Sequence, residues 1–380
     1  MGQITKNAKE LASNYSGATV SVLGSHSALD ICQGAKENAL PNIVVCQKGR
    51  DELYSRHYKY RNTAIGHAGC VDEILLLDKF ADISKKENVQ KLQKKQAIFV
   101  PHRSFSVYVG YEKIEKEFEV PIFGNRWLLR AEERNVAKNQ HYLLQKAGVN
   151  VPKTFSSPDK IDRLCIVKAS EAKRSWERAF FFASTPQQYE EKSQKMIKEG
   201  IITADGLKNA LIEEFALGAQ FNFNYFFSPL TGELELLGID TRRQTNLDGW
   251  LHLPATQQLE LAKVAKVNNI EAGHIACTIR ESLLEQVFEI GEKFVKGVKK
   301  EKEYSDGIIG PFALQGSLCP AEKGEEIFIF DVSFRVPGSP GTRFTPYTQY
   351  LFGKSVSVGN RIAYEIKQAQ KMKQMEKIVT

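Results

Sequence analysis

The sequence contains 380 residues, of which 42% are hydrophobic and 26% are charged, and its formal net charge at pH 7 is +7. A chain of this length is too long for one ordinary hydrophobic core, so we expect two or three domains of a globular protein. The excess positive charge is spread along the chain without a basic stripe or a known nucleic-acid motif. It argues against a nucleic-acid partner and favours small anionic ligands.

The sequence also lacks signals for membranes and for oxidising compartments. No apolar run approaches the roughly 20 residues of a membrane span, and the first residues lack the apolar core of a signal peptide. The six cysteines are scattered, without the Cys-x-x-Cys spacing of a zinc or redox site. We therefore expect a reduced, cytoplasmic protein without a membrane partner and without structural zinc.

Helices and strands are expected to alternate in the first third of the chain. A short amphipathic helix is expected over residues 3–15, and another helix over residues 28–38. The apolar runs that are typical of strands lie at residues 18–23, 42–46, 74–77 and 97–100. This order of strand, loop, helix and strand predicts a βαβ unit and hence a parallel sheet.

Two loops follow strands of this predicted sheet, at residues 24–27 and 101–105. Each loop contains a histidine and a serine, among them His26 and Ser104. Ligands of open α/β sheets bind at the carboxyl ends of the strands, where side chains and backbone N–H groups can hold a phosphate or a carboxylate. The alternative is that the serines only cap the helices that follow.

The middle of the chain is expected to begin with a charged helix over residues 126–147. The runs expected to form strands lie at residues 164–168, 179–183, 211–215, 220–227 and 233–240, with a helix at 186–199. The later strands predict an antiparallel meander, followed by a loop that carries Arg242, Arg243 and Asn246. Lys168 ends an apolar strand, where it would either meet an anionic partner such as a phosphate or extend to water from an edge strand.

The last part of the chain contains a helix over residues 281–300, a β-hairpin over residues 310–336 and a basic C-terminal helix. Because side chains two apart in a strand share a face, we expect Asp331, Ser333 and Arg335 to line up, with Gln315 within reach on the preceding strand. A carboxylate, an amide oxygen and a guanidinium suit a site where Mg²⁺ meets phosphate. The alternative is a solvated strand face with an ion pair.

A set of short motifs extends over nearly the whole chain. The motifs are Gly24-Ser-His-Ser-Ala-Leu, Gly34-Ala-Lys, Lys48-Gly-Arg, Val100-Pro-His-Arg-Ser-Phe, Pro121-Ile-Phe-Gly-Asn-Arg, Ile212-Glu-Glu-Phe, Asn246-Leu-Asp-Gly, Arg280-Glu-Ser-Leu-Leu and Gly310-Pro-Phe. In combination, over roughly residues 16–380, they resemble the ATP-grasp ligases of the formate-dependent FAICAR synthetase family of archaeal purine biosynthesis. FAICAR is 5-formaminoimidazole-4-carboxamide ribonucleotide.

The resemblance implies a fold of mixed α/β and α+β class. An N-terminal parallel α/β domain, residues 16–125, would precede an ATP-grasp domain, residues 126–380, with a lid subdomain at about residues 150–212. Two antiparallel subdomains would enclose ATP. The implied reaction joins formate to the 5-amino group of AICAR through formyl phosphate, with ATP and Mg²⁺ or Mn²⁺ as cofactors, in the synthesis of IMP. The implied partners are small molecules and further copies of the chain.

The resemblance also implies roles for individual residues. His26, Ser104 and Asn246 would contact the AICAR nucleotide, and Lys168 and Arg335 would act in phosphoryl transfer. The adenine hinge would be Glu213, Glu214 and Phe215, with Lys168 in the ATP cradle. The magnesium positions would be Gln315 and Asp331.

Three stretches differ from the family pattern. The lid at residues 169–178 contains no glycine and carries Lys173, Arg174 and Arg178, Asp331 stands where relatives have a glutamate, and the turn at residues 337–342 has another sequence. These differences leave two alternatives: an ATP-grasp ligase that acts on a different carboxylate or amine, or a non-catalytic member that binds nucleotides.

Overall fold

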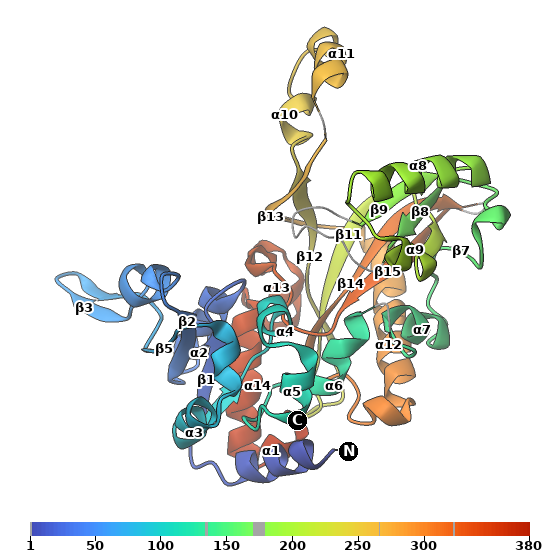
Figure 1. Ribbon diagram of the computed structural model, residues 1–380. Coiled ribbons are helices and arrows are strands. Elements are labelled where there is room, and N and C mark those ends of the chain that lie inside the picture. The colour runs from blue at the N-terminus through green and yellow to red at the C-terminus, as the bar shows by residue number, and fades with distance from the viewer. Residues whose placement is uncertain (1, 134–135, 170–178, 266, 322–323) are drawn as a thin grey trace.

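The computed structural model of the protein describes residues 2–133, 136–169, 179–265, 267–321 and 324–380 (Figure 1). Its N-terminal part contains a four-stranded parallel sheet in the order β5-β2-β1-β6. The strands are β1 (Thr19–Leu23), β2 (Asn42–Gln47), β5 (Glu73–Leu77) and β6 (Ala97–Phe99). All five residues of β1 are buried, as expected for a parallel strand that is covered on both faces. The expected strands and their parallel arrangement are therefore confirmed.

Helices and one hairpin complete the N-terminal part. The helices are α1 (Gln3–Ser13), α2 (Ala28–Glu37), η1 (Leu53–His57), η2 (Phe80–Ser84), α3 (Lys86–Lys94), α4 (Arg103–Val109) and α5 (Tyr111–Lys116). The hairpin of β3 (Arg61–Thr63) and β4 (Gly66–Ala68) projects from the body of the protein in Figure 1. Its residues are mostly exposed, and the sequence pattern did not predict it.

The prediction of a single helix over residues 126–147 is wrong. The structure contains α6 (Arg126–Leu129), η3 (Arg130–Glu132) and α7 (Gln140–Lys146) in its place. The buried Arg126 side chain donates hydrogen bonds to the backbone carbonyls of Ile114 and Phe118, at 3.0 and 2.9 Å, and Asn139 caps a new helix by accepting from Tyr142 N at 3.1 Å. Tertiary contacts and a new N-cap thus override the continuous helical pattern.

A small antiparallel sheet follows, in the order β7-β10-β8-β9. Its strands are β7 (Thr154–Phe155), β8 (Cys165–Lys168), β9 (Phe180–Ala183) and β10 (Leu211–Glu214), and the helices beside it are η4 (Pro158–Lys160), α8 (Pro186–Lys198) and α9 (Ala204–Lys208). A separate apolar cluster that includes Val167, Phe181 and Tyr189 forms its core. The expected strands and the helix at residues 186–199 are confirmed within a residue or two.

The large sheet has five antiparallel strands in the order β13-β12-β11-β14-β15. The strands are β11 (Ala219–Phe227), β12 (Leu234–Thr245), β13 (Asn269–Cys277), β14 (Gly310–Ala321) and β15 (Gly324–Ser333). The expected hairpin of β14 and β15 is confirmed. β12 continues to Thr245, so Arg242 and Arg243 lie in a strand and not in the expected loop, because β13, which the sequence pattern did not predict, pairs with it.

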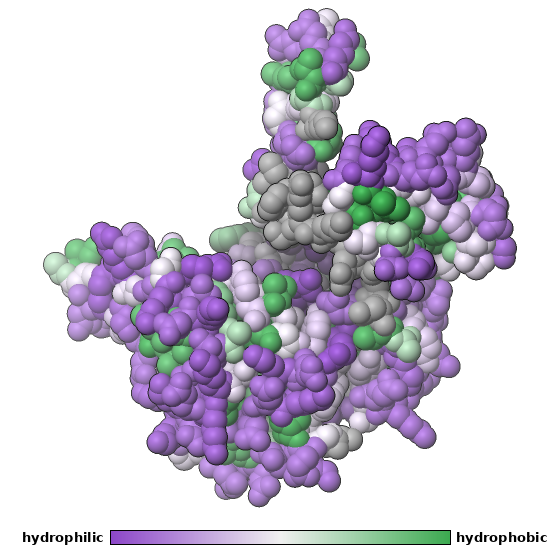
Figure 2. Space-filling model, viewed as in Figure 1, coloured by the Kyte–Doolittle hydropathy of each residue, from purple (hydrophilic) through white to green (hydrophobic). Residues whose placement is uncertain are grey.

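The remaining helices pack on the large sheet, form a projecting arm or return to the N-terminal part. The helices are α10 (Asp248–Leu251), α11 (Ala255–Val264), η5 (Glu281–Leu283), α12 (Leu284–Lys299), η6 (Lys302–Tyr304), η7 (Pro340–Phe344), α13 (Tyr347–Phe352), α14 (Val358–Met372) and η8 (Met375–Lys377). We call α10 and α11 the arm; in Figures 1 and 2 it stands away from the body and shows hydrophobic groups, with Leu251, Leu259 and Val264 exposed. Among the described helices, none is both long and apolar enough to cross a membrane.

The C-terminal segment returns to the N-terminal sheet. α14 packs along α2 so closely that a Cβ atom on Gly34 would lie 2.1 Å from the carbonyl carbon of Gly359. Arg361, on the same helix, bonds to Glu235 of β12 at 2.7 and 2.8 Å. One apolar cluster therefore contains residues of β1, α2, β12 and α14, which holds the parallel sheet against the large antiparallel sheet.

Candidate active site

Two neighbouring cavities lie beside the large sheet. We call the first, of about 660 Å³, the histidine cavity because His26 and His274 line it, and the second, of about 850 Å³, the lysine cavity because Lys168 lines it. Both cavities are lined by Asn222, Arg242, Gln315 and Asp331. The two spaces therefore meet at these side chains, which come from the four adjacent strands β12, β11, β14 and β15.

The lysine cavity lies between the small sheet and the large one. Lys168 on β8 contacts the Glu213 carboxylate on β10, and its Nζ lies 5.6 Å from the centre of the Phe330 ring on β15. Glu213 is 2% exposed, and its Oε2 has no hydrogen-bond partner among the described residues. A half-buried cation and a buried acceptor with spare capacity would suit a ligand that carries both anionic oxygens and N–H groups.

The walls of the lysine cavity are largely apolar. They include Ile166, Phe180, Phe182 and Phe215, and the Phe182 and Phe215 rings meet edge to face with centroids 4.8 Å apart. An apolar slot with a few polar groups is typical of sites for planar heterocycles. Glu214 also lines the cavity, but its carboxylate pairs with Arg163 at 3.3 Å. Its side chain is therefore already engaged by a cation.

Gln315 and Asp331 form an oxygen-donor pair at the junction of the cavities. They are register partners on β14 and β15, so Gln315 lies across from Asp331, within the reach that the sequence predicted, and Gln315 is 7% exposed. The described residues contain no group of three or more His, Cys, Asp and Glu side chains that could hold a metal alone. A carboxylate and an amide oxygen fit Mg²⁺, which takes its remaining ligands from water and phosphate.

A largely buried ion pair borders the histidine cavity beside Asp331. Arg335 is 12% exposed, its Nη2 lies 3.2 Å from Glu132 Oε2, and its Nε has no partner among the described residues. Burial raises the pKa of Glu132 although Arg335 opposes the shift. Asp331, Ser333 and Arg335 all line this cavity, as strand alternation predicted. The sequence pattern did not identify Glu132, because the residue was predicted to lie within the charged helix over residues 126–147.

The loops of the parallel sheet meet beside the histidine cavity. Ser104 Oγ donates to Ser25 Oγ at 3.0 Å, and the His26 and His102 rings stack with centroids 5.6 Å apart. His102 is fully buried and its Nε2 donates to the Leu23 carbonyl at 2.9 Å; burial lowers its pKa to about 3, so the ring is neutral. His26 lines the cavity, whereas Ser104 is not among the described residues that line either cavity.

Asn246 lies apart from His26 and Ser104. It follows the end of β12 at the base of the arm, where its Oδ1 accepts a hydrogen bond from Asn268 N at 2.9 Å. The structure therefore places His26 in one cavity with the junction residues, whereas Ser104 and Asn246 are not among the described residues that line either cavity. The lid residues Lys173, Arg174 and Arg178 lie outside the described residues.

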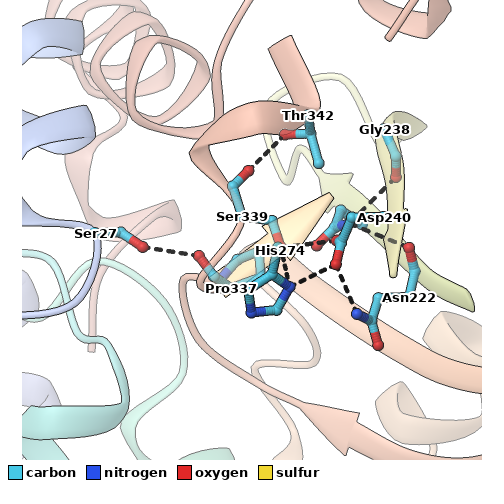
Figure 3. A network of polar contacts seen from close by, with 9 residues as sticks. Ser27, Asn222, Gly238, Asp240, His274, Pro337, Ser339 and Thr342 are labelled. Carbon is cyan, nitrogen blue, oxygen red and sulfur yellow. Dashed lines mark hydrogen bonds and ion pairs between the residues drawn. The ribbon is translucent and has the colours of Figure 1, made fainter. Parts of the chain in front are cut away.

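A polar network around Asp240 borders the histidine cavity, and its members Asn222, Asn224, His274 and Ser339 line that space (Figure 3). Asp240 is 1% exposed and accepts hydrogen bonds from Asn222 Nδ2 at 2.7 Å, Asn224 Nδ2 at 2.7 Å, Ser339 Oγ at 2.7 Å and His274 Nδ1 at 2.5 Å. Burial by itself would raise the pKa of Asp240, but these hydrogen bonds outweigh it and lower the pKa. Sequence reasoning missed this network; the alternating Asn222 and Asn224 were the available signal.

Comparisons with known proteins cover nearly the whole chain. Residues 188–380 match a domain of unknown function, DUF1297, and residues 20–155 match a protein family of unknown function, DUF1246. The chain is 40% identical over 374 residues to a 5-formaminoimidazole-4-carboxamide-1-(beta)-D-ribofuranosyl 5'-monophosphate synthetase of Methanopyrus kandleri, with 98% of each chain covered. It is 38% identical to the protein of the same name from Methanocaldococcus jannaschii, with 97% and 96% covered.

Solved structures agree with this assignment. An IMP biosynthesis protein, PurP, from Thermococcus kodakaraensis is 26% identical, with a TM-score of 0.67, and the alignment covers 95% of this chain and 100% of the other. An N5-carboxyaminoimidazole ribonucleotide synthetase, PurK, in complex with ADP shares the fold at 11% identity, with a TM-score of 0.57 and 90% and 79% covered. The expected ATP-grasp fold is confirmed, and the chain belongs to the family of 5-formaminoimidazole-4-carboxamide ribonucleotide (FAICAR) synthetases.

Proposed function

We propose that the protein joins formate to the 5-amino group of AICAR at the expense of ATP and releases FAICAR, ADP and phosphate. The observation that supports this most is the junction of two cavities at Gln315 and Asp331. ATP in the lysine cavity would place its terminal phosphate at this junction. The histidine cavity is then left for the acceptor and formate, so the reacting groups meet where the cavities join.

In this proposal the lysine cavity holds ATP. The adenine ring lies against Phe215 and the other apolar walls, Glu213 accepts from N–H groups, and the Lys168 ammonium pairs with phosphate oxygens. Gln315 and Asp331 would hold Mg²⁺ or Mn²⁺, which supplies charge neutralisation of the triphosphate. Lys168 would exchange part of its contact with Glu213 for the phosphates.

The reaction has two steps. A formate oxygen attacks the terminal phosphorus of ATP, the bond to the bridging oxygen of ADP breaks, and formyl phosphate forms. The amine of AICAR then attacks the formyl carbon, the C–O bond to phosphate breaks, and the amine proton leaves to phosphate or solvent. Arg335 lines the histidine cavity, and its buried Nε has no partner among the described residues; its guanidinium would stabilise the charge that develops on the transferred phosphoryl group and would orient formate.

The two alternatives from the sequence have less support. The two relatives named above, both called FAICAR synthetases, match over at least 96% of their own length, and the proposed site residues all lie in the described part of the chain. A different carboxylate or amine, or a non-catalytic role, would need a change in the junction residues. Gln315 and Asp331 provide an amide oxygen and a carboxylate that can bind a metal ion at the junction.

The remaining expectations are also proposals. We propose a cytoplasmic enzyme that forms homo-oligomers and has no nucleic-acid or membrane partner. The exposed apolar side chains of the arm support contacts between copies. We also propose the division into an α/β domain at residues 16–125 and an ATP-grasp domain at residues 126–380, since a separate apolar cluster forms within the latter part.

Isotope-labelled formate tests the proposed reaction. With ¹³C-formate, ATP–Mg²⁺ and AICAR, mass spectrometry should detect FAICAR that carries one ¹³C atom. With ¹⁸O-formate, one ¹⁸O atom should appear in the released phosphate, because a formate oxygen stays on phosphorus when the C–O bond breaks. Labelled FAICAR without ¹⁸O in phosphate would contradict the formyl phosphate step. No labelled product would contradict the proposed function itself.

A further inference from the structure

A third cavity, of about 480 Å³, lies beside the small sheet, and we call it the side cavity. Thr154 of β7, Leu211 of β10 and His141 of α7 are among the residues that line it. Thr154 is the register partner of Glu213, and Leu211 is the register partner of Lys168. Directly opposite residues of an antiparallel pair share a face of the sheet. The side cavity and the lysine cavity, which Glu213 and Lys168 line, therefore lie on the same face.

His141 carries a buried nitrogen atom that has no partner. Its Nε2 forms no hydrogen bond with any described residue. The helix that carries the ring is fixed in place, because the neighbouring Gln140 accepts from Val332 N of β15 and donates to the Glu132 carbonyl at 3.1 Å. Buried polar atoms without partners are rare and costly, so each of them calls for an explanation.

Glu213 holds a second such atom on the same face of the sheet. Its Oε1 contacts the Lys168 ammonium, whereas its buried Oε2 has no partner among the described residues. These two charges act on the His141 ring: burial lowers the pKa of His141, the Glu213 carboxylate opposes this shift, and Lys168 adds to it. While Lys168 pairs with Glu213, the His141 ring is therefore neutral at pH 7.

ATP in the lysine cavity would change the partner of Glu213. In the proposed function, the Lys168 ammonium exchanges part of its contact with Glu213 for phosphate oxygens. The Glu213 side chain is only 2% exposed, and a buried carboxylate that loses its cation is strongly destabilising unless another donor replaces it. His141 Nε2 is a buried nitrogen on the same face that no described residue engages.

We propose that His141 is a positioning residue of the nucleotide cavity. When ATP draws Lys168 to its phosphates, His141 takes up a proton and donates Nε2–H to Glu213, which keeps the carboxylate oriented towards the N–H groups of adenine. This inference rests on the proposed function, since it requires ATP in the lysine cavity. The proton comes from solvent through the side cavity, which His141 lines. His141 itself contacts neither ATP nor the reacting atoms.

The other charged groups around α7 do not offer His141 an acid. Lys153 and Lys160 line the side cavity; both are exposed, so solvent and salt screen their charges. β15, which packs against α7, contributes Asp331, which lines the two larger cavities. α12 meets α7 through an apolar cluster. The described residues that line the side cavity include no carboxylate, so Glu213 is the acid to which His141 responds.

Proton uptake on ATP binding tests this role. The full-length wild type, His141→Gln and His141→Asn would be titrated by calorimetry with ATP–Mg²⁺, without formate or AICAR, between about pH 5.5 and 8, where histidine changes charge. Two buffers that differ in ionisation enthalpy give the number of protons taken up. Both amides keep an N–H donor but cannot become charged. His67→Gln, an exposed histidine on the β3–β4 hairpin, is the matched control.

We expect the wild type to take up more protons than either His141 variant, by at most about one proton for each ATP bound. Because the pKa of His141 is raised in the complex, the extra affinity of the wild type is present at low pH and is lost as pH rises through that value. The ratio of wild-type to variant affinity should therefore be at least about fivefold higher at pH 5.5 than at pH 8. Ionisation of ATP itself cancels in this ratio, and His67→Gln should match the wild type.

The inference and the proposed function can fail separately. If the wild type binds ATP–Mg²⁺ but the His141 variants take up as many protons, or lose the same affinity at every pH, the role of His141 is wrong and the proposed function stands. If proton uptake depends on His141 but no FAICAR forms, the inference stands and the proposed reaction is wrong. If the wild type does not bind ATP–Mg²⁺ at any pH, both are wrong.

Discussion

Gln315 of β14 and Asp331 of β15 are register partners, and each side chain lines both cavities of the protein. A β-bulge in the ladder lies immediately after Gln315, between it and Gly316. Bulges increase local twist and redirect side chains, and they are common beside active sites. The pair is therefore placed where a nucleotide in one cavity and an acceptor in the other would both reach it.

The first prediction concerns Asp331. Asp331→Asn removes the proposed carboxylate ligand of Mg²⁺ and should lower turnover by about a hundredfold or more, because charge on the transferred phosphoryl group is no longer neutralised. Steady-state phosphate release measures the effect. Glu326→Gln, an exposed acid on the same strand, is the matched control and should leave turnover unchanged. Turnover of Asp331→Asn within a few-fold of the wild type at saturating Mg²⁺ would refute the assignment.

The second prediction concerns His26. His26→Ala should raise the KM for AICAR much more than the KM for ATP, because His26 lines the histidine cavity and not the lysine cavity. Initial rates at varied concentrations of each substrate separate the two constants. If both KM values rise equally, the loop at residues 24–27 has a structural role only.

The third prediction concerns Asp240 and pH. The pKa of Asp240 is lowered in the folded protein, so its ionised form contributes stability that is present above the ordinary aspartate pKa of about 3.9 and is lost as pH falls through the lower folded value. Asp240→Asn should therefore destabilise the protein at neutral pH, by about 1–3 kcal/mol for the unsatisfied donors left behind.

Denaturant unfolding at several pH values measures this effect. The difference in unfolding free energy between wild type and Asp240→Asn should shrink as the pH is lowered below about 4. A difference that stays constant down to the acid limit of folding would show that the pKa of Asp240 is not lowered in the folded protein. Asp205→Asn, an acid at an exposed helix, is the control and should show no such trend.

The fourth prediction concerns the link between α14 and the large sheet. Arg361 is 5% exposed and bonds to Glu235 at 2.7 and 2.8 Å and to Glu365 at 2.8 Å. Arg361→Ala leaves two buried carboxylates without their cation, so it should lower the unfolding free energy by about 3–5 kcal/mol. Lys371→Ala, exposed on the same helix, should change it by no more than about 0.5 kcal/mol. Similar values for the two variants would contradict the role of the network.

The fifth prediction concerns the glycine-free lid, which lies outside the described residues. If Lys173, Arg174 and Arg178 hold the triphosphate by charge, ATP affinity should weaken as ionic strength rises, since exposed charges are screened over about 10 Å at 0.1 M salt. The triple alanine variant should show a shallower dependence. Calorimetric titration of ATP–Mg²⁺ at two salt concentrations gives both slopes, and identical slopes would mean that these cations do not contact ATP.

The sequence predicted the elements whose patterns are local. The parallel strands are continuous apolar runs, and the β14–β15 hairpin has clear alternation, so Asp331 and its neighbours could be placed on one face. The sequence pattern did not predict β13, because this strand contains Gly273 and follows the long insertion that forms the arm. The charged pattern of residues 126–147 also hid the start of α7, which has its own N-cap, Asn139.

The candidate site was predictable only in part, for a similar reason. Motif resemblance pointed to His26, Lys168 and Gln315, which the structure places around two connected cavities. Glu132, Asp240 and His274 become visible only when strands far apart in sequence are paired. Asn246 is the opposite case. Its motif suggested a contact with the acceptor, but in the structure its Oδ1 accepts a hydrogen bond from Asn268 N at the base of the arm.

The central claim is that phosphoryl transfer from ATP is coupled to the formylation of AICAR. Steady-state phosphate release, measured with ATP–Mg²⁺ alone, with formate, with AICAR and with both, tests it most directly. We predict rapid release only when formate and AICAR are both present, with one phosphate for each FAICAR formed. Equal phosphate release in the absence of AICAR or of formate, or faster release with another carboxylate or amine, would contradict the account.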